Sequence, residues 1–374
     1  MMDFMDYVEE DSLLYYIRSH LNEYGELPAD FSLDYHVNGA RKLESETEGD
    51  FDYFLPDGLI DGNIFLEMDY SVEIPEPLCR SLMLASEENY VEAAEAAADY
   101  LSGSEPRRMI QYVNGLYSWV ESGEADLKGQ CIYNLAYNIL RQDNEIEMVK
   151  FALFIMTFLD ASARPEAVDM INLFSRSDEF TLFCTWAMKE WPNRNERTFD
   201  MLRHVKGWGR ITGLSSLSPE TEEIRRWLVT DGWKTSLSRE DAVLTVVHAI
   251  DVEEFLGGKN PADSYIFKNI TAMLKVLLHS EEGDDYCGMD QMENPWPLCT
   301  AWLSECSRQF RNLEIYETAA KITRYAYRRA GEKEALELKK KGTDFLFTVE
   351  CRDTLKAALK EGKGQKLAEF LGLI

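Results

Sequence analysis

The residues best suited to binding chemistry are aromatic and basic side chains that follow one another between residues 208 and 234. Tryptophan stacks on flat ligands such as nucleobases, and arginine binds anions through its planar fork of donors. The candidate binding residues are Trp208, Arg210, Arg225, Arg226 and Trp233, with Trp227 and Lys234 beside them. This set therefore indicates either a ligand groove or a group of packed aromatic side chains.

Packing is the simpler interpretation for part of this set, because large aromatic side chains are normally buried for their area. Trp227, beside Ile224 and Leu228, is expected in the core. Trp208 and Trp233 stand next to glycines and charges, so we expect them nearer the surface. Residues 201–250 carry 7 basic and 6 acidic side chains, which is far short of a nucleic-acid groove.

Metal and cofactor chemistry finds no support in the sequence. His204, His248 and His279 fall on separate expected helices, and no pair has the close spacing of metal ligands. The segment 57–67 is rich in Asp and Gly, but Leu59 stands where an EF-hand calcium loop requires a carboxylate. Phosphate-binding glycine loops and the Gly-x-Ser-x-Gly elbow are absent from the sequence. We therefore predict no metal, no cofactor and no catalytic residue, and the chain is more simply a binding protein than an enzyme.

The elements that must position these residues are helices, one after another from about residue 86 onward. Ser86 begins an alanine-rich segment, and the motif Ser218-Pro219-Glu220 has the capping hydroxyl, proline and acid typical of a helix start. The most apolar run, Met148–Leu159, is interrupted by Lys150 and is too short to span a membrane, so it predicts a buried core helix. We predict two domains, an acidic N-terminal module over residues 1–85 and a helical-repeat domain over 86–374.

The N-terminal module mixes a short amphipathic helix near Leu13–Leu21 with an irregular stretch rich in Gly and Pro. Within that stretch, Ile64-Phe65-Leu66 and the segment 70–74 are expected to be short strands or extended loop.

The helical body resembles repeat proteins of the HEAT and armadillo type. The resemblance is clearest over residues 204–232, where Lys206-Gly207-Trp208-Gly209-Arg210-Ile211 precedes Glu222-Glu223-Ile224-Arg225-Arg226-Trp227-Leu228. Helix pairs recur near the roughly 40 residues of such repeats, and similar helical-repeat sequences occur in bacterial proteins. The resemblance implies an all-α, right-handed superhelix of stacked helix pairs, covering residues 86–374, in which an arginine often faces the inner surface.

Charge is distributed unevenly along the chain. The net charge is −28, yet residues 1–100 carry 25 acidic and 4 basic side chains, and residues 301–374 carry 11 acidic and 15 basic. An acidic region of this kind attracts a basic partner, covers a basic surface of its own chain, or simply keeps the protein in solution.

Localisation is predicted from the same composition. The first ten residues lack the basic and apolar regions of a signal peptide, and the seven cysteines have no paired spacing. These features predict a cytoplasmic protein with buried, reduced thiols and no membrane segment.

The sequence is compatible with two functions. The leading one is a non-enzymatic interaction scaffold, or an inhibitor or immunity-type protein, that binds a basic protein partner. Nucleic acid is not expected as a partner. The alternative is a helical-repeat enzyme that acts on a nucleobase or small molecule in a concave groove around Trp208, Arg210 and Trp233. Some HEAT-like DNA glycosylases use tryptophans in such a groove.

Overall fold

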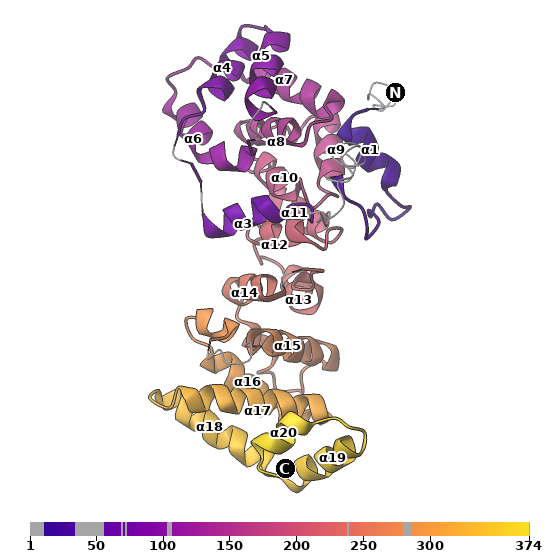
Figure 1. Cartoon of the computed structure of the whole chain (residues 1–374), viewed down its shortest axis with the longest axis vertical. Coiled ribbons are helices and arrows are strands. Elements are labelled where there is room, and N and C mark those ends of the chain that lie inside the picture. The colour runs from indigo at the N-terminus through magenta and orange to yellow at the C-terminus, as the bar shows by residue number, and fades with distance from the viewer. Residues whose placement is uncertain are drawn as a thin grey trace, which may run out of the picture. The chain divides into compact units, whose positions relative to one another are not determined.

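The structure is a computed structural model that describes residues 11–33, 56–68, 70–71, 73–102, 107–237, 239–279 and 286–373. Within these ranges, 19 α-helices pack against one another and no strand occurs, which confirms the all-α fold class (Figure 1). The chain divides into an N-terminal unit, Met1–Ser218 with Thr235–Leu237, and a C-terminal unit, Pro219–Lys234 with Ser238–Ile374. The domain boundary predicted near residue 86 rests on charge and composition, and it stays a prediction. Residues 1–10 and 34–55 of that predicted module lie outside the described ranges.

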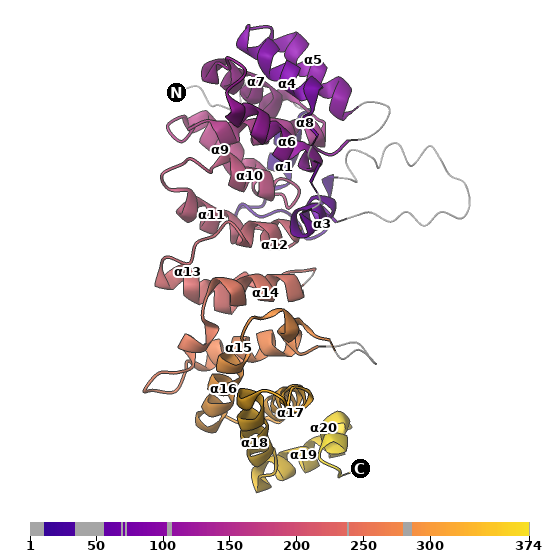
Figure 2. The same cartoon turned by 90° about the vertical axis from the view of Figure 1, so that its left-hand side faces the viewer.

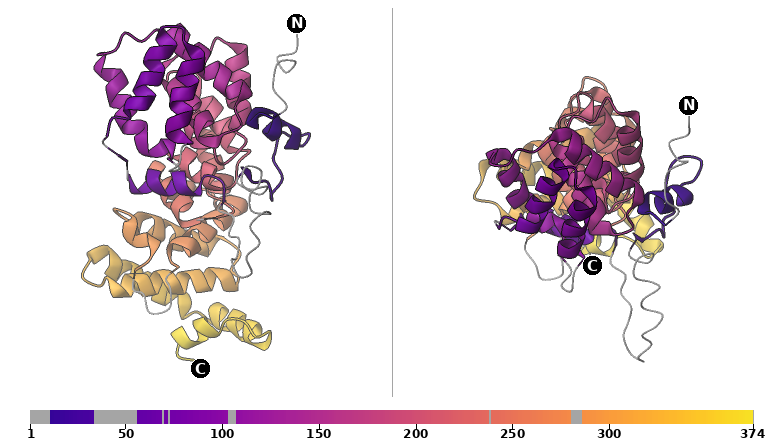
Figure 3. Two further views of the ribbon diagram at one scale, coloured as in Figure 1. Left: turned by 45° about the horizontal axis from the view of Figure 1, so that its top comes forward. Right: turned by 90° about the horizontal axis from the view of Figure 1, so that it is seen from above.

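The N-terminal unit is assembled around α8, which contacts α5, α6, α7 and α10. The first helix, drawn in indigo, packs on α7 and α9 (Figure 3). The helices of this unit are α1 (Leu13–His20), α3 (Leu59–Glu67), α4 (Glu76–Ser86), α5 (Tyr90–Leu101), α6 (Met109–Ser122), α7 (Gly129–Gln142), α8 (Ile146–Ile155), η2 (Met156–Phe158), α9 (Pro165–Phe174), α10 (Thr181–Ala187), α11 (Arg194–Leu202) and α12 (Trp208–Leu214).

The prediction of a buried helix in the most apolar run is confirmed. Every residue of Met148–Ile155 in α8 is buried, and the 3-10 turn η2 continues it. Lys150 is buried among them with no exposed surface, although a lysine is almost never fully buried unless its charge is paired. This helix therefore carries a charge into the core of the unit.

The strand prediction for Ile64-Phe65-Leu66 is wrong, because these residues belong to α3. The helix begins after Gly58, whose φ of 77° is left-handed, and it packs on α6 and α12. Tyr70, Ser71, Glu73 and Ile74 are not in a strand either, and Val72 lies outside the described residues. Short apolar runs suit both strand and helix, and here tertiary packing selects the helix.

Two helix starts also differ from prediction. Ser86 ends α4 instead of starting the next helix, and α5 begins at Tyr90. The helix cap predicted at Ser218 lies at Thr221 instead. The Thr221 hydroxyl accepts a hydrogen bond of 3.2 Å from the Ile224 amide at the start of α13. Both differences shift an element by three or four residues while keeping its type, as expected for helix ends predicted from sequence.

The C-terminal unit consists of helices in a regular succession (Figure 2). One series of contacts runs from η3 to α15, then to α17 and α19, and α16 packs on α18. The elements are α13 (Glu222–Trp227), the π-helical turn η3 (Leu228–Gly232), α14 (Arg239–Ala249), η4 (Val252–Phe255), α15 (Ser264–Leu277), η5 (Gly288–Gln291), α16 (Trp296–Glu305), η6 (Cys306–Arg308), α17 (Leu313–Arg328), α18 (Lys333–Leu346), α19 (Val349–Lys360) and α20 (Gln365–Phe370).

All seven cysteines are free and buried, which confirms the predicted burial of the thiols. Among the described helices, none combines the length and the apolar composition needed to cross a bilayer.

Candidate functional site

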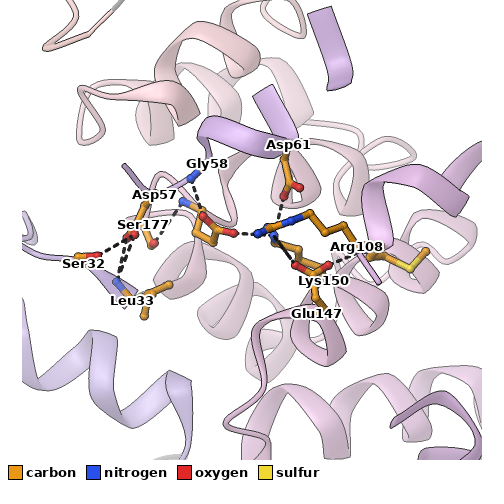
Figure 4. A network of polar contacts seen from close by, with 11 residues as sticks. Ser32, Leu33, Asp57, Gly58, Asp61, Arg108, Glu147, Lys150 and Ser177 are labelled. Carbon is orange, nitrogen blue, oxygen red and sulfur yellow. Dashed lines mark hydrogen bonds and ion pairs between the residues drawn. The ribbon is translucent and has the colours of Figure 1, made fainter. Parts of the chain in front are cut away.

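The most distinctive polar feature of the N-terminal unit is a buried ion-pair cluster centred on Lys150 of α8 (Figure 4). The Lys150 Nζ lies 2.6 Å from Asp61 Oδ2, 3.0 Å from Glu147 Oε1 and 2.5 Å from Glu179 Oε1. The side chains of Lys150 and Asp61 are 0% and 3% exposed. Because Asp61 is on α3 and Glu179 precedes α10, the cluster joins three segments distant in sequence.

Backbone amides extend this Lys150 cluster. The Gly58 amide donates to Glu179 Oε2 over 2.5 Å, and the Met109 amide donates to Glu147 Oε2 over 2.6 Å. Arg108 lies 3.7 Å from the other oxygen of Glu147. The starts of α3 and α6 are thereby attached to the same carboxylates that bind Lys150.

Two further carboxylates lie next to the cluster. Asp57 accepts the Leu33 amide over 3.1 Å and the Ser32 hydroxyl over 3.3 Å. Asp178 accepts the amides of Gly207 and Gly209, over 3.0 and 2.8 Å, where α12 begins. Asp178 thus serves as an acceptor for the free N–H groups at a helix start, although it comes from a distant segment.

Burial and neighbouring charges shift the pKa values of the side chains in this cluster. Burial alone would lower the pKa of Lys150, but Asp61, Glu147 and Glu179 raise it well above its usual value. Burial opposes ionisation of Glu179 as well, yet Lys150 and the Gly58 amide bring its pKa below the ordinary value. Lys150 and Glu179 are therefore the charged pair at the centre of the cluster.

The pKa values of three aspartates in this region, in contrast, favour the neutral form. Burial, with the nearby Glu179, raises the pKa of Asp57 to about 7. Burial raises the pKa of Asp61 to about 7 as well, against the opposing effect of Lys150. The pKa of Asp178 is raised to about 6, again chiefly by burial. These carboxyl groups take up protons close to neutral pH.

The cluster is largely shielded from solvent, so its role is structural in the first place. The side chains of Glu147 and Glu179 are 16% and 11% exposed, and both are fully engaged with Lys150 and backbone amides. Among the described residues, no group of His, Cys, Asp and Glu side chains is arranged to hold a metal ion. A surface hollow of the same unit is formed by other residues: Asn172, Asn193, Glu196, Arg197 and Asp200.

The structure places two of the predicted binding residues, Trp208 and Arg210, in the N-terminal unit. Trp208 is 8% exposed and Arg210 is 5% exposed, so the expectation that Trp208 lies nearer the surface is wrong. The reason is Gly62 of α3, which has no side chain and packs on the indole ring. Arg210 Nε donates to the carbonyl of Leu202 over 3.1 Å.

The other three predicted binding residues belong to the C-terminal unit. Trp233 is 5% exposed and donates its indole N–H to the Val229 carbonyl over 2.9 Å, so its expected surface position is also wrong. Arg225 pairs with Glu254, and Arg226 lies 3.2 Å from Asp263. Each of the five residues is therefore engaged within its own unit, and their role in binding stays a prediction.

No protein-family model, curated protein or solved structure matches this chain. Conclusions about function consequently rest on the residues and the geometry given above.

Gly62 allows α3 to approach Trp208, so Gly62→Ala is expected to loosen this helix. A Cβ atom at residue 62 would lie 2.6 Å from the Trp208 ring, and overpacking of this kind costs about 1–3 kcal/mol. We expect faster amide hydrogen exchange over residues 59–67. Gly331→Ala is the control, because a Cβ atom there meets no atom within 4 Å. Equal exchange in both variants would show that the close approach does not hold α3.

Proposed function

We propose that this chain is a helical-repeat scaffold that binds a basic protein partner and catalyses no reaction. The observation that carries the proposal is the concentration of unpaired acidic side chains on one face of the N-terminal unit. That face is the acidic hairpin, defined here as α4 and α5 with the turn between them (Figure 1). The two helices pack on each other and on α7, so the opposite side of the hairpin is turned to solvent.

The acidic hairpin exposes six carboxylates and a single basic side chain, Arg80. The carboxylates are Glu76, Glu87, Glu88, Glu92, Glu95 and Asp99. Four of them, at 88, 92, 95 and 99, follow helical spacing along α5 and its preceding turn, and none of these four has an ion-pair partner in the described part of the chain. Met83 and Val91, 44% and 68% exposed, supply apolar surface on the same hairpin.

A surface of this composition suits a basic partner, because complementary charge accelerates association and excludes acidic competitors. It is a poor surface for nucleic acid, whose phosphates require cations. The net charge of the whole chain, −28, favours the same class of partner.

The repeat architecture is supported by the sequence separation of polar contacts in the C-terminal unit. Arg226 bonds Asp263, 37 residues away, and Lys275 bonds Glu314, 39 residues away. Arg311 pairs with Glu350, also 39 residues away. These separations fit the roughly 40-residue period of HEAT and armadillo repeats, which present long surfaces for protein partners.

The alternative function, an enzyme that acts on a nucleobase or small molecule, needs an accessible pocket around Trp208, Arg210 and Trp233. These side chains are 8%, 5% and 5% exposed, and those of Trp208 and Trp233 are packed against their own units. The observations thus favour the scaffold.

The proposal is tested by comparative affinity capture from native lysate at low and high salt. The neutralised variant carries Glu88→Gln, Glu92→Gln, Glu95→Gln and Asp99→Asn. The matched control carries Glu334→Gln, Glu337→Gln, Asp344→Asn and Glu369→Gln, which removes the same charge from exposed positions of the C-terminal unit.

We expect a basic protein that the wild type and the control retain at low salt, that salt releases, and that the neutralised variant fails to retain. Equal capture by the neutralised variant, or no salt-sensitive protein with any of the three, would contradict the proposal.

A further inference from the structure

Helix α3 is held in place by buried polar contacts as well as by partly buried apolar side chains, among them Ile64 and Phe65. Residues 56–68 are called the strap here. Within the strap, the buried residues are Gly58, Asp61 and Gly62, and its apolar side chains are half-buried or exposed, with Met68 78% exposed. A helix of nine residues is not stable alone in water. The strap therefore depends on the contacts that attach it to α8, α10 and α12.

Those contacts converge on carboxylates. The Gly58 amide donates to Glu179, and Asp61 pairs with Lys150 over 2.6 Å. Asp57 receives the Leu33 amide, which attaches the strap to the segment that follows α1. Phe65 adds a ring contact with Trp186 of α10, with centroids 6.3 Å apart. Each polar contact changes strength with the charge of the carboxylate that makes it.

Carboxylates outnumber cations around the strap. The acids are Asp57 and Asp61 of the strap itself, Glu147 of α8, and Asp178 and Glu179 before α10; the cations are Lys150 of α8, Arg108 before α6 and Arg210 of α12. Five acids facing three cations in a poorly solvated region retain protons. Lys150 pairs with Oδ2 of Asp61, whereas Oδ1 is buried and receives no hydrogen bond, so the Asp61 anion is less well stabilised than that of Glu179, both of whose oxygens have partners.

The charge states follow from this arrangement. Burial raises the pKa of both Asp57 and Asp61 to about 7, whereas these groups titrate near 4 when exposed to water. The seated strap thus binds more protons than the released strap between about pH 4 and pH 7. Raising the pH through this range favours release. Lys150 also pairs with Glu147 of α8 and with Glu179 before α10, and neither of these two contacts involves a residue of the strap.

We propose that the strap packs over Trp208 and Lys150 at mildly acidic pH and detaches from them at mildly alkaline pH. Release uncovers the indole ring that Gly62 contacts, and it gives solvent access to a lysine that is otherwise fully buried. The surface of the N-terminal unit thereby gains an aromatic ring and a cation without unfolding of its core. This inference does not depend on the identity of any partner.

The test is amide hydrogen exchange of the full chain at about pH 5.5 and about pH 8.5, expressed as protection factors that remove the intrinsic pH effect. The variant Asp57→Asn with Asp61→Asn carries uncharged isosteres that mimic the protonated carboxyls. The control Glu67→Gln with Glu73→Gln removes the same charge from exposed positions. Peptides from α17 of the C-terminal unit provide an internal reference.

We expect protection over residues 59–67 to fall about tenfold or more at the higher pH in the wild type and the control. In the Asn variant it should change by less than about threefold, and α17 should not respond. Constant protection in the wild type, the same fall in the Asn variant, or protection lost in the Asn variant at both pH values would overturn the proposal.

A second measurement guards against misfolding of the double variant. Asp57→Asn alone leaves the Asp61–Lys150 pair intact, and it should weaken the pH dependence of exchange over residues 59–67 without abolishing it.

The fluorescence of Trp208 gives an independent measurement. The difference spectrum between the wild type and Trp208→Phe should shift to longer wavelength as the pH rises, because the ring becomes exposed to water. An unshifted difference spectrum would show that Trp208 stays buried, and it would contradict the proposed release of the strap.

Discussion

Replacing Lys150 by methionine is expected to lower the free energy of unfolding of the N-terminal unit by about 3–5 kcal/mol. Methionine fills a similar volume, so the loss comes from charge rather than from a cavity. Asp61, Glu147 and Glu179 would face one another without the cation that lies within 3.0 Å of each. The loss of unfolding free energy is measured by urea unfolding, with hydrogen exchange in α8 and α10 as the probe.

The Lys150→Met variant has a clear rescue and a clear control. Adding Asp61→Asn and Glu179→Gln removes the two closest carboxylates and should restore most of the stability. Lowering the pH should also reduce the loss, because the unpaired carboxyls then take up protons. Lys189→Met, at a lysine that is 43% exposed beside Glu190, should change stability by less than about 1 kcal/mol. An equal effect at both lysines would refute a structural role for the cluster.

The second large effect is expected in the C-terminal unit, where Trp302→Ala should cost about 3–5 kcal/mol. The Trp302 ring is fully buried and stacks on Phe267 with centroids 5.9 Å apart. Its indole N–H donates to Thr271 Oγ1 over 2.9 Å. Truncation therefore leaves both a cavity and a buried hydroxyl without its donor. The measurement is urea unfolding, with amide hydrogen exchange in α15 and α17 as the probe.

Trp302→Phe separates the two contributions, because it keeps a ring in the core but removes the indole N–H. We expect it to cost less than Trp302→Ala. Phe310→Ala is the surface control, since Phe310 is 87% exposed, and it should leave the unfolding curve unchanged. If Trp302→Ala behaved like the surface control, Trp302 would not be part of the core of this unit.

A helix formed by a long apolar run was predictable from sequence, and a helix held by contacts with distant segments was not. The run Met148–Leu159 is apolar enough to define a core helix without further information. The residues of α3 form no such run, and the helix is stabilised by Gly58, Asp61 and Gly62, which contact segments more than 80 residues away. Local propensity holds no information about those contacts, which explains the wrong strand prediction at Ile64-Phe65-Leu66.

The cluster left a partial signal in the sequence. Lys150 interrupts an otherwise apolar run, and a charge at that position predicts a buried partner of opposite sign. The acidic segment 57–67 lacks the carboxylate pattern of a calcium loop, yet it supplies Asp57 and Asp61 to this region. Nothing in the sequence pairs that segment with Lys150. In the same way, the glycine that buries Trp208 comes from α3 and not from the neighbouring Gly207 or Gly209.

In the function proposed here, the acidic hairpin recognises a basic partner by charge. The most direct measurement is the association rate of the captured partner with the wild type, the neutralised hairpin variant and the matched control, over a range of salt concentrations. We expect the neutralised variant to associate about tenfold more slowly than the wild type and the control at low salt, with a weaker salt dependence. Association rates that are the same for all three proteins at every salt concentration would contradict it.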